Sequence, residues 1–234
     1  MRARISGKYR NRLLAALAPD DLASLAPHLT PVTLERRKNL ECPNKAIQDL
    51  YFVEHGIASV VAVGDAKGEI GLIGCEGVTG IAIILGDDRS PHETYIQVAG
   101  DGQRIGAAVM REIIMASPRL RSLLLRYAQS FMIQTAHTAV ANVNGSGEQR
   151  LARWLLMAHD RIDGDDIPLT HEFIALMLGT RRPGVTEAVR ALARRGLIRT
   201  ERSLITLIDR VGLEKQAGKY YGVPEREYNR MIGS

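Results

Sequence analysis

The chain has 234 residues, of which 45% are hydrophobic. That is enough to bury one large core or two modest ones, and it excludes a disordered tail. The longest apolar runs, such as Ile81–Leu85, are far too short to cross a bilayer. The net charge of +5 is a weak indication of nucleic-acid binding. Cys42 and Cys75 are the only cysteines, too few to hold an iron–sulfur cluster or a four-cysteine zinc site.

The N-terminal segment 1–12 is basic and contains no acidic residue. Its apolar continuation, Leu13–Ala18, is short and runs into Pro19–Asp20. We therefore expect a mature amphipathic helix rather than a signal peptide, and a cytoplasmic protein. Leucines at helical spacing predict helix over residues 5–26, with Pro19–Asp20 starting a new turn.

From residue 30 to residue 110, segments of four to seven residues rich in Val, Ile, Thr and Tyr alternate with Gly, Asp and Pro clusters. Regular short strands with turn signals predict an antiparallel sandwich or barrel of jelly-roll type. The expected strands are Asp49–Glu54, Ala58–Val63, Gly68–Ile73, Thr94–Val98 and Gln103–Gly106.

Glycine recurs at every third position in GEIGLIGCEGVTG, residues 68–80. A loop that cradles phosphate is one interpretation, because glycine lets backbone N–H groups approach an anion. The segment lacks G-x-x-x-x-G-K-[ST] and G-x-G-x-x-G, so tight turns between barrel strands are the favoured alternative.

Residues 108–143 return to helical spacing, and Ser117–Pro118 predicts a helix start. The apolar stripe that follows needs a partner surface. We expect this long helix both to lie on the barrel and to pair with its own copy, on different faces. The stripe assigned to the dimer interface consists of Leu120, Leu124, Tyr127, Phe131, Gln134 and Thr138.

The segment Asn144–Gly147 is small, polar and flexible in composition, which indicates a domain boundary. Three parts are expected: a domain over 1–116, a dimerisation helix and hinge over 117–144, and a second domain over 145–234. The fold class is then α+β.

Residues 170–196 have the pattern of a helix-turn-helix. Thr170 can cap a first helix that stops at Gly179, and Thr180 can cap a second helix that ends at Gly196. Ala175 suits a close helix crossing, and Val185 suits the plug between the two helices. The following GLIRTERSLITLID predicts two strands around a turn at Thr200–Ser203, so the domain reads as a winged helix. The alternative is a plain three-helix packing domain with solvated arginines.

The second helix of a helix-turn-helix enters the major groove, and its N-terminal residues meet base edges. Arginine there can donate two hydrogen bonds to guanine or hold a phosphate. Glu187 could accept from cytosine or pair with a neighbouring arginine, while arginines beyond the helix add phosphate contacts. The predicted DNA-binding residues are Thr170, Thr180, Arg181, Arg182, Val185, Thr186, Glu187, Arg190, Arg199 and Arg202.

The segment LTHEFIALMLGTRRPGVTEAVRALARRGLI resembles the cyclic-AMP receptor protein/Fnr (Crp/Fnr) family of bacterial transcription regulators. The resemblance implies a jelly-roll, cyclic-nucleotide-binding-like sensor domain, a long dimer helix and a winged helix-turn-helix domain. It also implies a homodimer on a near-palindromic double-stranded DNA operator, with RNA polymerase as a further partner. By position, Arg182 is the base-contacting arginine. Pro183 and Glu187 stand where cyclic-AMP-dependent members carry a glutamate and a second arginine.

The effector site departs further from that family. Cyclic-nucleotide-binding members carry a Gly-Glu pair for the ribose and an Arg-Ser or Arg-Thr pair for the cyclic phosphate. Here the pairs read Gly80–Ile81 and His92–Glu93, with Arg89–Ser90 a few residues early. Since a glutamate would repel the phosphate, we expect no response to cyclic AMP. The candidate effector residues are Gly77, Gly80, Ile81, Arg89 and Ser90.

Other cofactors receive no support from the sequence. The clustered N-terminal cysteines of oxygen-sensing members are absent, so no iron–sulfur cluster is expected, and no metal site is assigned. Haem ligation by one of the six histidines stays open.

Two functions remain in view: a DNA-binding transcription regulator, and a small-molecule-binding module whose second domain contacts protein. An enzyme is not expected, because H-E-x-x-H, G-x-S-x-G and P-loop motifs are missing, and no catalytic residue is assigned.

Overall fold

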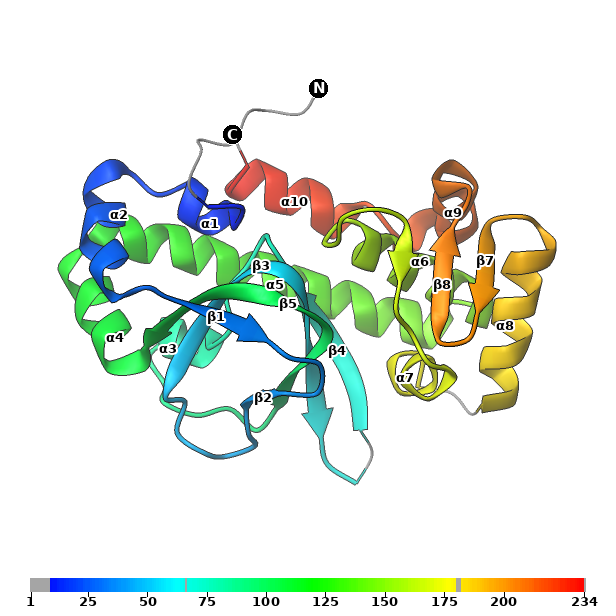
Figure 1. Cartoon of the computed structure of the whole chain (residues 1–234), viewed down its shortest axis with the longest axis horizontal. Coiled ribbons are helices and arrows are strands. Elements are labelled where there is room, and N and C mark those ends of the chain that lie inside the picture. Colours follow the sequence, from blue (N-terminus) through cyan, green and yellow to red (C-terminus); the bar gives the residue numbers. More distant parts are fainter. Residues whose placement is uncertain (1–8, 66, 180–181, 234) are drawn as a thin grey trace.

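The computed structural model describes residues 9–65, 67–179 and 182–233 of the chain. It has an N-terminal antiparallel sheet, a long helix that runs beside it, and a mainly helical C-terminal domain with a small sheet of its own (Figure 1). This arrangement confirms the predicted α+β class. Within the described residues, no helix is both long enough and apolar enough to span a bilayer.

Two short helices precede the sheet: α1 (Arg12–Ala15) and α2 (Pro19–Leu25), followed by the 3-10 turn η1 (Ala26–His28). Asn11 caps α1, and its amide also donates to the carbonyls of Val53 and Gly77 at 2.8 Å each. Pro19 begins α2, as predicted. Residues 5–8 of the expected 5–26 helix region lie outside the described residues.

The N-terminal sheet has five strands: β1 (Thr30–Leu34), β2 (Asn39–Glu41), β3 (Asp49–Val63), β4 (Lys67–Ile73) and β5 (Glu93–Gly106). The order is β1-β5-β3-β4, with β2 also on β5, and every pair is antiparallel. The predicted antiparallel domain is confirmed, while closure into a barrel stays a prediction.

Glycines predicted to end strands lie inside longer ones. Register shifts occur between β3 and β5 around Gly56, whose φ is +89°. A Cβ on Gly100 would lie 2.0 Å from the His55 carbonyl oxygen, so the two backbones touch there. These glycines therefore form bulges in continuous strands rather than breaks between strands.

Glycines in β4 and in the segment after it make room for large side chains. A Cβ on Gly71, Gly74 or Gly77 would come within 2.8 Å of a side-chain atom of Phe131, Arg161 or Tyr127. The segment also turns, since the Gly77 N–H donates to the Gly74 carbonyl at 3.0 Å, so its glycines serve both a tight turn, as favoured, and close packing.

Three helices follow: α3 (Ile81–Leu85), α4 (Ala107–Ala116) and α5 (Pro118–Asn144). Ser117 caps α5 as predicted, because its hydroxyl accepts from the Leu120 N–H at 3.1 Å and donates to Asp21 at 2.6 Å. At 27 residues, α5 extends about 40 Å and runs along both parts of the molecule (Figure 1).

The C-terminal domain begins with α6 (Gly147–His159), which Ser146 and Gln149 close with a capping box. Then come β6 (Asp166–Ile167), α7 (His171–Met177) and α8 (Arg182–Arg194). The hairpin of β7 (Ile198–Glu201) and β8 (Leu204–Leu207) confirms the predicted wing, and β6 adds a third strand beside β8. The core of the C-terminal domain contains Leu151, Leu155, Ile174, Val185, Val189, Leu192 and Leu213.

The chain ends with a segment that the sequence analysis does not predict: α9 (Arg210–Ala217), the 3-10 turn η2 (Gly218–Tyr220) and α10 (Val223–Met231). Helix α10 packs against α5 and extends back toward α1 (Figure 1). The Tyr228 hydroxyl donates to the Glu76 carbonyl at 2.7 Å, and Tyr228 and Ile232 enter the N-terminal core. The C-terminal segment thus ties the second domain to the first.

Candidate nucleic-acid interface

The helix-turn-helix is built by the local signals in the sequence. Thr170 caps α7 through a bond from the Phe173 N–H at 3.4 Å, and Gly179 has the left-handed φ of +54° that ends this helix. Helix α8 is described from Arg182 onward. Thr180 and Arg181, both predicted to bind DNA, lie outside the described residues.

The outer face of α8 is cationic and open. Arg182, Glu187, Arg190 and Arg194 are exposed, while Thr186 is half-buried and donates to the Arg182 carbonyl at 3.2 Å. Across 9–65, 67–179 and 182–233, no ion pair includes an α8 arginine, so Glu187 pairs with neither arginine proposed for it. These guanidinium groups are available to an outside partner.

The wing adds further cations beside this helix. Arg202 is exposed at the turn between β7 and β8, and Arg199 is exposed with Glu201 at 3.7 Å. Exposed ion pairs of that length hold a side chain weakly, so Arg199 can exchange partners. Arg195, by contrast, forms an ion pair with Glu148 at 3.1 Å and a hydrogen bond with Gln216, both inside the domain.

Val185 requires a correction. It is fully buried between α7 and α8, so it positions the second helix and cannot touch DNA itself. Its burial agrees with its predicted place as the plug between the two helices.

The stripe assigned to the dimer interface also requires correction. Leu120, Leu124, Tyr127 and Gln134 are buried within their own chain. The Gln134 amide pairs with both the N–H and the C=O of Leu72 on β4, and Phe131 and Thr138 are half-buried on the same side. The stripe fixes α5 to its own N-terminal sheet, because the sheet and α10 already cover it.

A second apolar row lies on the opposite, exposed face of α5. Its members follow a spacing of four and three residues alternately, which is the heptad pattern of paired helices. Met132 is 58% exposed and Val143 82% exposed, which is unusual for apolar side chains. The row, called here the α5 seam, consists of Leu125, Gln129, Met132, Ala136, Ala139 and Val143. The same spacing is present in the sequence.

The predicted effector residues do not line a common cavity. Gly77 packs on the Tyr127 ring, and Gly80 on Leu50. Ile81 packs between two apolar clusters, and Arg89 is exposed and pairs with Asp88 at 2.8 Å. The Ser90 hydroxyl accepts from the His92 N–H at 3.1 Å.

A carboxyl group of the chain itself occupies the hydrogen-bonding position at the Gly80 N–H. Glu41 on β2 is buried and accepts from the Gly80 N–H at 2.8 Å. Burial raises the pKa of Glu41, and the bond from Gly80 opposes that rise. An incoming phosphate would have to displace this side chain.

The first helix of the helix-turn-helix packs on the N-terminal sheet. The ring of Phe173 lies 6.2 Å from that of Tyr95, and the Arg36 guanidinium lies 5.2 Å from the Phe173 ring centre. Beside them, the Trp154 indole on α6 donates to Glu69 on β4 at 2.6 Å, and the Ser59 hydroxyl donates to the same carboxyl at 2.5 Å. The two domains therefore share a partly polar, buried contact.

In the part of the chain that the structure describes, no three His, Cys, Asp or Glu side chains lie close enough together to hold a metal ion. Both cysteines are free thiols.

The winged helix-turn-helix with its open cations is a Crp-like helix-turn-helix domain, and it follows an antiparallel sheet and a long helix. Residues 149–216 match the family model described as the Crp-like helix-turn-helix domain. The match ends inside α9, so α10 lies beyond it. No curated protein matches the chain in sequence.

Solved structures share the fold over most of their length. A Crp/Fnr-family regulator from Eubacterium rectale is 18% identical, with a TM-score of 0.68 and coverage of 88% of this chain and 97% of its own. FixK2 from Bradyrhizobium japonicum is 13% identical, with a TM-score of 0.69 and coverage of 81% of this chain and 98% of its own. A Crp-family regulator from Thermus thermophilus, TTHB099, is 21% identical, with a TM-score of 0.65 and coverage of 80% of this chain and 97% of its own.

Proposed function

We propose that the protein is a Crp/Fnr-type transcription regulator that binds a near-palindromic DNA operator as a homodimer, and that its N-terminal domain does not respond to cyclic AMP. The observation that carries the DNA part is the open cationic face of α8 with the wing beside it. In this proposal Arg182 and Arg190 read base edges, and Arg199 and Arg202 hold phosphates.

The dimer part is supported by the α5 seam. From Leu125 to Val143 it extends over about 27 Å of helix, and its exposed apolar side chains have no cover within the described residues. In a twofold-symmetric dimer, the α5 seam of a second copy would cover the α5 seam of the first. Two copies then place their α8 helices at half-sites about 34 Å apart, one turn of DNA.

Replacement of Arg182 by alanine tests the assigned base contact. We expect a loss of about 10- to 100-fold in operator affinity and a relaxed preference at one base pair of each half-site, because one bidentate arginine–guanine pair contributes about 1–3 kcal/mol. Sequences selected from a random DNA pool by the wild type and the variant measure both effects.

Arg202→Ala is the matched control for that experiment. It should weaken binding to all sequences alike and reduce the salt dependence by about one phosphate contact. An unchanged motif in Arg182→Ala, or an altered motif in Arg202→Ala, would contradict the assigned roles.

Cyclic AMP should leave operator affinity unchanged. Ile81 supplies no carboxylate for a ribose, Arg89 is paired with Asp88 on the surface, and Glu41 occupies the Gly80 N–H. Titration of the protein with cyclic AMP, followed by operator binding, measures this. A saturable heat of binding together with tighter operator binding would refute the expectation.

A regulator of this kind would work in the cytoplasm with DNA and a second copy as partners, and RNA polymerase as a further one. Its family consists of regulators rather than enzymes. A second domain that contacts only protein is the competing function, and failure to retain genomic DNA fragments at low salt would favour it.

A further inference from the structure

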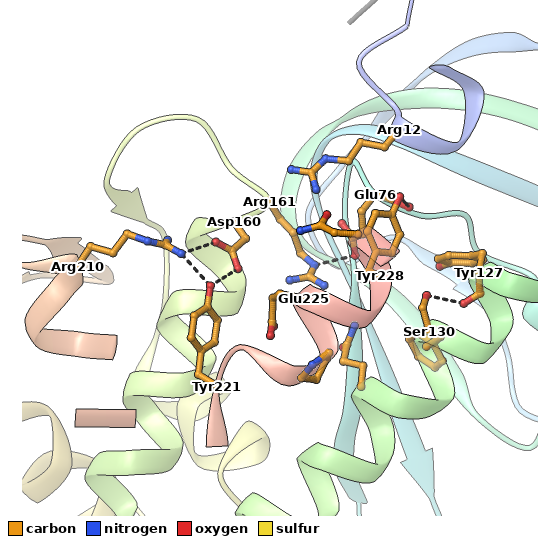
Figure 2. A pocket seen from close by; sticks show the side chains of 14 residues that line it. Arg12, Glu76, Tyr127, Ser130, Asp160, Arg161, Arg210, Tyr221, Glu225 and Tyr228 are labelled. Atoms are coloured by element: carbon orange, nitrogen blue, oxygen red, sulfur yellow. Dashed lines mark hydrogen bonds and ion pairs between the residues drawn. The ribbon is translucent and has the colours of Figure 1, made fainter. Parts of the chain in front are cut away.

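A cavity of about 310 Å³ lies where the two domains and the long helix meet (Figure 2). Its walls come from α1, the segment after β4, α5, the end of α6, α9 and α10. None of the five candidate effector residues lines it. Ligand pockets in proteins are typically about 300–1,000 Å³, so this volume suits a small molecule of about one ring.

One wall is aromatic and apolar. Tyr127, Phe131 and Tyr228 line it together with Pro224. Both tyrosine hydroxyls donate away to backbone carbonyls, of Val78 at 3.0 Å and of Glu76 at 2.7 Å. What these side chains offer to the cavity is therefore ring surface.

Two of the three acidic groups that line the cavity, Glu76 and Asp160, are paired with arginines (Figure 2). Glu76 pairs with Arg161 at 2.8 Å. Asp160 accepts from Arg210 at 2.8 Å and from the Tyr221 hydroxyl at 2.7 Å. Glu225 accepts from the Gly222 N–H at 2.9 Å. Glu76 and Asp160 are thus neutralised by arginines, while Glu225 forms no ion pair with the described residues.

Two arginines retain donors. The Arg161 side chain is only 8% exposed and uses Nε for Glu76 and Nη1 for the Met157 carbonyl at 2.6 Å. Its Nη2 forms no hydrogen bond with any residue that the structure describes, although the group lies against the cavity. Burial disfavours its charge, but Glu76, Asp160 and Glu225 outweigh burial and raise the pKa of Arg161, so the guanidinium stays charged.

Arg12 is the second free donor. It is exposed, and its side chain enters no ion pair or hydrogen bond with the described residues. Figure 2 shows Arg12 reaching from α1 over the cavity toward Arg161. The free Nη2 of the largely buried Arg161 side chain and the free cation of Arg12 at the rim together form a receptor for an anionic group.

We propose that this cavity binds a small aromatic carboxylate, with the carboxylate between Arg12 and Arg161 Nη2 and the ring against Tyr127, Phe131 and Tyr228. Arg12 belongs to the N-terminal domain, and Arg161 and α10 belong to the C-terminal one. The bound ligand therefore links the two domains. Its binding does not depend on DNA.

Calorimetry on the full chain with benzoate tests the site, and benzamide is the neutral probe of the same shape. We expect saturable binding of benzoate and at least about 10-fold weaker binding of benzamide, since bonds to charged groups contribute more than neutral ones. Arg12→Met should weaken benzoate about 10-fold. Its exposed side chain can be lost without harm to the fold, which an unchanged melting temperature confirms.

Arg226→Met is the matched control, because Arg226 is an exposed arginine on α10 that does not line the cavity. It should bind benzoate as the wild type does. A crystal with 4-bromobenzoate should place the bromine beside Phe131 by its anomalous signal. The site is overturned by absence of saturable benzoate binding at millimolar concentration, by equal binding of benzamide, by unchanged binding in Arg12→Met, or by bromine found only elsewhere.

Discussion

Replacement of Met132 by glutamate should convert the protein from dimer to monomer and weaken operator binding by about 100-fold or more. Met132 is the central member of the α5 seam and is 58% exposed in the single chain, so the substitution leaves the monomer's core intact. In the pair of helices, two glutamates would face each other across the symmetry axis and lose water, which is strongly unfavourable. A monomer then binds one half-site and loses the gain from simultaneous contact with two.

Sedimentation measures the dimer, and gel shift on the selected operator measures the affinity. Met115→Glu is the matched control, because Met115 is 74% exposed on α4 and lies outside the seam. It should remain dimeric and bind as the wild type does. If Met132→Glu stays dimeric at the same concentration, the α5 seam is not the interface.

Replacement of Glu69 by glutamine should stabilise the protein at pH 8 by up to roughly 3 kcal/mol. Glu69 is buried at the contact of β4 with α6, where burial raises its pKa to about 7 from 4.5, against the opposing effect of Ser59, Trp154, Arg153 and Arg161. Each pKa unit corresponds to about 1.4 kcal/mol of differential stability.

The sign follows from the direction of that shift. A carboxyl whose pKa is higher in the folded state favours folding while it is protonated in both states, below about pH 4.5. The contribution is lost as pH rises through about 7, because the folded state must then hold a buried charge. Glutamine keeps the shape of the protonated acid, so it can accept from Trp154 and donate to Ser59 at every pH.

Urea unfolding of wild type and Glu69→Gln from pH 5 to pH 8 measures this difference. The two curves should converge at low pH and separate as pH rises, with the variant more stable. Trp154→Phe keeps most of the ring but removes the indole donor, and it should be less stable than the wild type. Parallel curves for wild type and Glu69→Gln would contradict the assignment.

The helix-turn-helix was predictable because its signals are local. Thr170, Gly179 and the wing turn each act within a few residues, so cap and turn chemistry determine them. Ser117–Pro118 predicted the start of α5 for the same reason.

The faces of α5 could not be assigned in the same way. Both the buried stripe with Tyr127 and the exposed α5 seam with Met132 repeat at helical spacing, and only the tertiary fold decides which one the sheet covers.

Contacts between residues that are far apart in the sequence could not be predicted either. Helix α10 reaches Glu76, 152 positions earlier in the chain, and Gly56 and Gly100 meet across a bulge. The cavity at Arg161 is formed by both domains and by this last helix, so no local sequence pattern predicts it.

The most direct test of the central claim is protection of guanine N7 in the major groove from methylation by dimethyl sulfate on a selected operator. If two copies of α8 enter the DNA, protection should fall on two symmetric guanines about one helical turn apart. It should vanish in Arg182→Ala at a concentration that still saturates the site. Protection confined to the minor groove, a single protected half-site, or full protection retained by Arg182→Ala would contradict the account.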